Sequence, residues 1–150
     1  MKQIRTGVFE TNSSLTHSIV MCPTAGYNEW ADKETMLFNQ YLKPKFVTIE
    51  EGRKYNADVM RKWRDEIEDG CFDYGEEDAI EALTDENIEK YIAGEFDFES
   101  FCLDSYSVAE YMYYTFDYWN EYICEYRETF ESHYEENGVK VTAFGYYGHD

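Results

Sequence analysis

The chain has 150 residues, 43% of them hydrophobic and 19% aromatic, with 13 Lys and Arg against 32 Asp and Glu, a formal net charge of −19. This length fits one folded domain, and chains so rich in aromatic residues do not stay disordered. The negative charge repels nucleic acids and anionic membranes, which excludes direct binding to either, and it favours a basic partner.

The N-terminal region has the composition of a β-hairpin. Residues 4–9 and 15–21 read as short strands. Thr, Asn and Ser occupy positions 11–14 between them, where such side chains hydrogen-bond their own backbone in turns. Pro23 and Pro44 follow, and we predict both in loops.

The best helix signal begins at Thr48. Thr48 and Glu51 match a capping box, in which each side chain accepts from the other residue's amide, and Gly70 is a natural end. The apolar residues of this stretch recur at helical spacing and are expected on its buried face: Tyr55, Val59, Met60, Trp63 and Ile67.

A second helical pattern runs from about residue 77 to Gly94, with Thr84 able to divide it in two. Aromatic residues are then frequent, and 12 of the 31 residues from 96 to 126 are Phe, Tyr or Trp. In this stretch Ser105 or Ser107 could cap one helix, and Thr115 is predicted to cap another.

The C-terminal tail carries the clearest strand signal. Residues 126–136 and 139–147 flank Asn137 and Gly138, the favoured pair for a type I′ hairpin turn, where both central residues need positive φ. We therefore predict an α+β fold in which one domain, residues 1–150, builds an antiparallel sheet from its N- and C-terminal hairpins and packs the middle helices on one face.

The four cysteines, Cys22, Cys71, Cys102 and Cys124, are far apart and form no CxxC pair. The first residues of the chain lack the apolar core of a signal peptide. We therefore expect a cytoplasmic protein with reduced, mostly buried thiols and no disulfide framework. No run of about 18 apolar residues indicates a membrane span.

The charge is distributed unevenly along the sequence. Residues 1–62 carry nine Lys and Arg against seven Asp and Glu, a net of +2, whereas residues 63–150 carry four against 25, a net of −21. Carboxylates are dense from the last turns of the Thr48 helix to residue 78, and we predict that this group contacts the basic surface of a partner: Asp65, Glu66, Glu68, Asp69, Asp73, Glu76, Glu77 and Asp78.

A catalytic or ligand site is the alternative, and its place is the hairpin at residues 11–18. His17 could activate Ser13 or Ser14, with Asn12 and Glu10 nearby, because a nucleophilic hydroxyl needs an adjacent base. The same string also reads as a hydrogen-bonded turn, and we prefer this structural interpretation.

No motif indicates a cofactor or metal. Glu131 and His133 share one face of a predicted strand, but two ligands do not make a metal site, and the acidic stretch at 69–78 fails the EF-hand spacing. The Gly-x-Ser-x-Gly elbow and the phosphate-binding glycine loop are absent. The sequence therefore favours binding over catalysis.

The two ends of the chain carry a resemblance. The opening RTGVFETNSSLTHSIVMC and the ending NGVKVTAFGYYGHD resemble the ends of small uncharacterised proteins of bacteriophages and bacteria, with Leu15 in place of a usual third serine. The resemblance covers about a fifth of the chain. It implies a viral or mobile-element origin and transfers no catalytic residue.

These observations predict a phage-type counter-defence protein. In charge and size the chain resembles acidic DNA mimics, including anti-restriction and anti-CRISPR proteins, which occupy the basic nucleic-acid groove of a host nuclease. Nuclease grooves are lined with Lys and Arg that track phosphates, and carboxylates can replace a phosphate row. A small enzyme or ligand-binding protein is the first alternative, and a virion or assembly component is the second.

Overall fold

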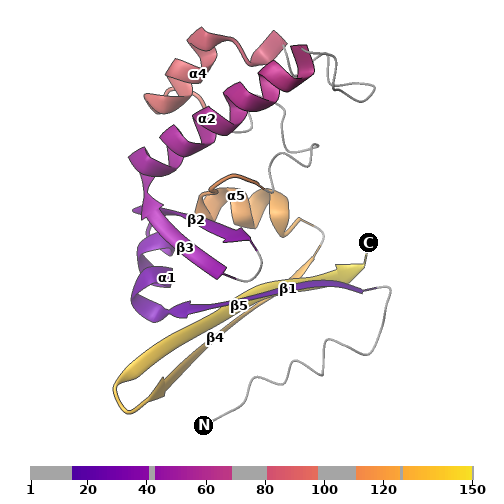
Figure 1. Ribbon diagram of the computed structural model, residues 1–150. Helices are drawn as coiled ribbons and strands as arrows, with labels where there is room; N and C mark the ends of the chain where they lie inside the picture. Colours follow the sequence, from indigo (N-terminus) through magenta and orange to yellow (C-terminus); the bar gives the residue numbers. More distant parts are fainter. Residues whose placement is uncertain (1–14, 41–42, 69–80, 98–110, 126, 150) are drawn as a thin grey trace. The chain divides into compact units, whose positions relative to one another are not determined.

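The computed structural model describes residues 15–40, 43–68, 81–97, 111–125 and 127–149 (Figure 1). Helices and antiparallel strands are both present, with the strands of the larger sheet drawn from the two ends of the sequence, which confirms the predicted α+β class. The chain divides into two compact units, which we call the terminal unit, Met1–Phe46 with Tyr114–Asp150, and the middle unit, Val47–Tyr113.

The terminal unit is built on a three-stranded antiparallel sheet of order β1-β5-β4. Strand β1 spans Leu15–Pro23, β4 spans Glu128–Glu136 and β5 spans Val139–His149. Residues 4–9, the other arm of the predicted N-terminal hairpin, lie outside the described residues. The described partner of β1 is β5, with Ile19 opposite Gly145.

The turn between β4 and β5 confirms the sequence prediction. Asn137 has φ 53° and Gly138 has φ 81°, the left-handed pair that a type I′ turn requires. The strands on either side then pair in register from Glu136 opposite Val139 to Glu128 opposite Tyr147. A two-residue turn therefore sets the register of the whole hairpin.

Five shorter elements complete the terminal unit. Helix α1 spans Thr24–Ala31, strands β2 (Thr35–Gln40) and β3 (Lys43–Thr48) form a two-stranded sheet, and helix α5 (Phe116–Tyr118) continues into the π-helical turn η4 (Trp119–Ile123). As predicted, the Thr115 hydroxyl caps α5 by accepting from the Tyr118 amide at 3.1 Å.

Two predictions for this unit were wrong. Pro23 is the last residue of β1 and Pro44 lies within β3, so neither is in a loop. Proline is tolerated at the start or on the edge of a strand, where its missing N–H breaks no ladder. The sequence interpretation also missed α1, whose first residue follows Pro23 directly.

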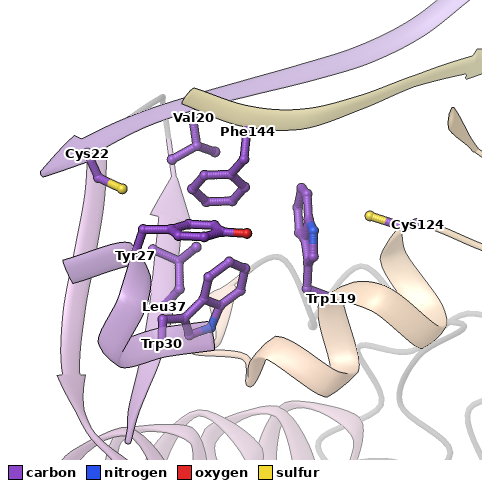
Figure 2. Close-up of a cluster of buried hydrophobic side chains, with 8 residues drawn as sticks. All are labelled: Val20, Cys22, Tyr27, Trp30, Leu37, Trp119, Cys124 and Phe144. Carbon is purple, nitrogen blue, oxygen red and sulfur yellow. The ribbon is translucent and has the colours of Figure 1, made fainter. Parts of the chain in front are cut away.

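An aromatic core lies on one face of the β1-β5-β4 sheet (Figure 2). Because side chains alternate along a strand, Val20 and Cys22 of β1 and Phe144 of β5 share this face. Trp30 of α1 is fully buried against them. The other buried members of the cluster are Tyr27, Leu37, Trp119 and Cys124.

Gly145 allows β1 and β5 to approach closely. A Cβ atom at this position would lie 1.9 Å from the backbone oxygen of Ser18 and 2.9 Å from the ring of Phe130. Since no real contact is that short, only glycine fits here. The close pairing of the two chain ends therefore depends on this residue.

The middle unit contains helices α2 (Ile49–Glu68) and α4 (Asp85–Ile92). The predicted capping box of α2 is present, since the Glu51 amide donates to Thr48 Oγ1 at 3.2 Å and the Thr48 amide donates to Glu51 Oε2 at 3.3 Å. Thr84 caps α4, as expected from its position in the second helical pattern. Gly70, the predicted end of α2, is outside the described residues.

The buried face of α2 differs in part from the prediction. Met60 and Ile67 are buried as expected, but Tyr55 is 45% exposed. The centre of the face is instead the polar residue Asn56, which is fully buried. Around it the packed residues are Ala57, Met60, Leu83, Ile88, Tyr91 and Met112.

Candidate partner-binding surface

The carboxylates predicted to contact a partner are described in part. Asp65, Glu66 and Glu68 are exposed on the last turns of α2, and we call them the α2 acidic end. The last turn of this helix contains no basic residue. The other five predicted residues, Asp69, Asp73, Glu76, Glu77 and Asp78, lie outside the described residues.

The acidic charge belongs mainly to the middle unit. Residues 47–113 carry 20 Asp and Glu against 6 Lys and Arg, a net of −14, out of the −19 of the whole chain. The terminal unit accounts for the other −5, with 12 acidic residues against 7 basic ones. The acidic segment 63–150 seen in the sequence is therefore divided between the two units.

The arginines of α2 bind the body of the middle unit. Arg53 Nη1 donates to the backbone oxygens of Tyr91 at 2.8 Å and Phe96 at 3.0 Å, and its guanidinium carbon lies 4.9 Å from the centre of the Tyr91 ring. Arg64 Nη1 donates to the Leu83 oxygen at 3.2 Å. These cations therefore stabilise the unit and are largely withdrawn from its outer surface.

Ion pairs neutralise some carboxylates of the middle unit. Arg64 bonds Asp85 at 2.6 Å, which lowers the pKa of that carboxyl and raises the pKa of the arginine. Arg61 bridges Asp58 and Glu89. At the α2 acidic end the one ion pair given by the described residues is Asp65 with Arg64 Nε, at 3.6 Å. Glu66 and Glu68 keep their charge exposed.

A second polar cluster lies in the terminal unit, at the edge of the aromatic core. His133 Nε2 bonds the Glu131 carboxylate at 3.0 Å and His133 Nδ1 bonds the Thr142 hydroxyl at 2.8 Å. This row of hydrogen bonds reaches helix α1 at both ends. Thr142 bonds Thr24 at 2.9 Å, and the Tyr27 hydroxyl donates to Glu131. We call these five residues the α1 clasp.

The proton positions in the α1 clasp follow from the chemistry of its groups. An ionised carboxylate only accepts, so Nε2 of His133 donates to Glu131, and Nδ1 bonds the Thr142 hydroxyl. Burial, then the bond to Glu131, raises the pKa of Tyr27, and the Tyr27 and His133 hydrogen bonds lower the pKa of Glu131. The clasp therefore joins α1 to both strands of the C-terminal hairpin.

The order carboxylate, imidazole, hydroxyl is that of a catalytic triad, but the hydroxyl is inaccessible. Thr142 is fully buried, while the side chains of Glu131 and His133 are about half-exposed. A nucleophile must reach its substrate, so we interpret this arrangement as structural and not catalytic. The sequence predicted that Glu131 and His133 share one face of a strand. It did not indicate Thr24, Tyr27 and Thr142, because none of these residues is a near neighbour of the histidine in sequence.

Most of the hairpin that was the alternative catalytic site lies outside the described residues. Asn12, Ser13 and Ser14 precede the described residues, and His17 lies on β1 opposite Tyr147 of β5. Among the residues that the structure does describe, no three His, Cys, Asp or Glu side chains form a group able to hold a metal ion. Nor do the described helices include one long and apolar enough to cross a membrane.

Two of the four cysteines are described, and both are buried and unpaired with another cysteine. Burial raises the pKa of Cys22 and of Cys124 to about 11. Since the thiolate is the reactive form, these two sulfurs are inert near neutral pH. Cys71 and Cys102 lie outside the described residues.

The clasp predicts a specific pH dependence. Because the pKa of Glu131 is lowered from its ordinary 4.5, its contribution to stability is present above that pH and is lost as the pH falls through the folded value. We expect Glu131→Gln to cost a few tenths of a kcal/mol to about 1 kcal/mol at pH 7, since the group is half-exposed. As the pH falls through the folded pKa of Glu131, the difference should vanish.

Urea denaturation followed by tryptophan fluorescence, at pH 7 and at an acid pH below that folded pKa, measures this difference. Glu29→Gln is the control, because Glu29 is an exposed carboxylate of α1 that makes none of the clasp's hydrogen bonds. An equal loss of stability for Glu131→Gln at both pH values would contradict the assignment.

Comparisons with protein-family models, with curated proteins and with solved structures found no match for this chain. The functional conclusion therefore depends on the geometry and charge of the chain itself.

Proposed function

We propose that the protein is an acidic nucleic-acid mimic of the phage counter-defence type, which inhibits a host nuclease by occupying its basic groove. The observation that carries the proposal is the α2 acidic end. Three exposed carboxylates lie within the last turn of this 20-residue helix, which contains no basic residue. The partner chemistry that fits them is a surface of Lys and Arg.

Helix electrostatics sharpen this observation. The C-terminal end of a helix carries a partial negative charge, so carboxylates there are unfavourable by about 0.3–1 kcal/mol each at low salt, whereas Lys or Arg would be favourable. The α2 acidic end therefore costs stability. Residues that act against local stability are expected at functional sites.

The middle unit also has the rigidity that a mimic needs. Arg53 and Arg64 bind backbone oxygens of the segment around α4, and Asn56 binds both backbone groups of Tyr113. Charges displayed on a preorganised surface lose less entropy when they meet a partner. Tyr55, exposed on the same helix, supplies an aromatic side chain of the kind enriched at interfaces.

The test neutralises the α2 acidic end by Asp65→Asn, Glu66→Gln and Glu68→Gln. The wild-type protein is used to capture proteins from a bacterial lysate at low salt, the bound fraction is released at high salt, and its DNA cleavage is measured with and without added protein. We expect wild-type protein to inhibit cleavage and the triple variant to lose at least about tenfold in potency, as two to three charge contacts are removed.

The matched control is Glu29→Gln, Glu34→Gln and Glu125→Gln, which removes three exposed carboxylates from the terminal unit. It should inhibit like the wild type, while the α2 variant should be folded and slightly more stable than the wild type. Capture that does not weaken with salt, or equal inhibition by both triple variants, would show that the α2 acidic end is not the binding surface.

A further inference from the structure

The two edges of the β1-β5-β4 sheet differ in chemistry. Among the residues that the structure describes, β4 pairs with β5 alone (Figure 1). Along its other side, every second residue of β4 directs its backbone N–H and C=O away from the sheet. Backbone groups that no described strand pairs with are a template for one more strand. We call this side the β4 edge.

The charge on β4 limits what can pair there. The strand carries four glutamates and no Lys or Arg, whereas β1, at the opposite edge, carries none of these charged residues. Glu131 belongs to the α1 clasp, and Glu128 accepts a hydrogen bond from Tyr147, whose pKa is raised by it. Glu135 and Glu136, both exposed, remain near the hairpin tip.

A second copy of this chain does not fit the β4 edge. Two β4 strands pairing in parallel and in register would place each of the four glutamates directly opposite its copy, and like charges in such positions are destabilising. A basic strand has the reverse effect, because opposite charges across a strand pair are favourable. The same carboxylates therefore disfavour pairing with a second copy and favour a cationic partner.

Alternation along β4 adds an apolar requirement. Glu128, Phe130, Ser132, Tyr134 and Glu136 share one face of the strand. Phe130 and Tyr134 are half-buried, and the ring of Phe130 lies over Gly145 of the neighbouring strand. A segment that pairs with β4 would therefore place apolar side chains beside these two rings and basic side chains beside the glutamates.

We propose that the β4 edge binds an extended basic segment of a partner protein by strand addition. Backbone hydrogen bonds supply the affinity, as in other β-augmented complexes, and the glutamates with Phe130 and Tyr134 select the sequence. This site lies in the terminal unit and does not depend on the proposed function of the α2 acidic end.

The probe is a synthetic nine-residue peptide in which Lys alternates with Val. It is titrated into the ¹⁵N-labelled full chain at low salt, and amide shifts and hydrogen exchange are followed by NMR. We expect shifts along β4 and at least about tenfold slower exchange at every second β4 amide. Glu135→Gln should weaken binding about threefold, since one cross-strand charge pair is lost.

Two further measurements separate strand addition from simple charge attraction. The same peptide N-methylated at alternate residues keeps its charge but loses its donors, so it should bind at least about tenfold more weakly. The variant Asp65→Asn, Glu66→Gln, Glu68→Gln should bind the peptide like the wild type. Equal affinity for the methylated peptide, no protection on β4, or loss of binding in the α2 variant would each overturn the proposal.

Discussion

Replacing Asn56 with leucine is expected to lower the free energy of unfolding of the middle unit by about 3–5 kcal/mol. Asn56 Nδ2 donates to the Tyr91 hydroxyl at 2.9 Å and to the Tyr113 oxygen at 2.8 Å, and its Oδ1 accepts from the Tyr113 amide at 2.8 Å. Leucine is of similar size but leaves the Tyr113 backbone groups buried without their partner.

Native-state hydrogen exchange of the α2 amides measures this loss in the middle unit separately from the terminal unit. The protection of these amides should fall by about a thousandfold, since each factor of ten corresponds to about 1.4 kcal/mol. Tyr91→Phe is the graded control, because it removes one of the three hydrogen bonds and should cost about 1 kcal/mol. If the leucine variant lost no more stability than Tyr91→Phe, the role assigned to Asn56 would be wrong.

Replacing Trp30 with alanine is expected to destabilise the terminal unit by about 3–5 kcal/mol, the usual cost of removing a fully buried tryptophan. Its ring contacts Phe116 at 5.0 Å and Phe144 at 5.2 Å between centroids, and its Nε1 donates to the Tyr114 oxygen at 3.3 Å. The cavity would therefore open between α1, the segment before α5 and the sheet (Figure 2).

The measurement is again hydrogen exchange, now of the β1 and β5 amides, together with the urea midpoint of the whole chain. Trp30→Phe keeps an aromatic ring in the core and should lose less than half as much stability. Protection in α2 should stay unchanged if the two units unfold independently. A midpoint for Trp30→Ala equal to that of the wild type would contradict the packing described for this cluster.

Local chemistry explains which parts of the fold could be predicted. The helix caps and the hairpin turn act on backbone groups within four residues of themselves, so they can be predicted from residues that are neighbours in sequence. They are Thr48 with Glu51, Thr115, and Asn137 with Gly138. The predictions that were wrong applied such local rules where tertiary contacts decide the outcome. Tyr55 matched the apolar spacing of α2 yet is exposed, because the buried face is centred on a polar residue whose partners, Tyr91 and Tyr113, come much later in the chain.

The candidate surface was predictable in composition and not in arrangement. The sequence shows that Asp65, Glu66 and Glu68 belong to an acidic stretch, and the structure places them exposed in the last turn of α2. It does not indicate that Arg53 and Arg64 on the same helix turn toward backbone oxygens, which decides how much positive charge remains beside the carboxylates. The α1 clasp was missed for a related reason, since Thr24 and Thr142 are 118 residues apart.

By itself the sequence determined the α+β class, the helix caps, the C-terminal turn and the negative net charge of the chain. These properties depend on neighbouring residues or on total charge, which need no knowledge of the fold. Only the tertiary structure decided that β1 pairs with β5, that Gly145 permits their approach, and that the acidic charge belongs mostly to a separate middle unit. Each depends on contacts between residues distant in sequence, which form only when burial of the cores offsets the entropy of closing long loops.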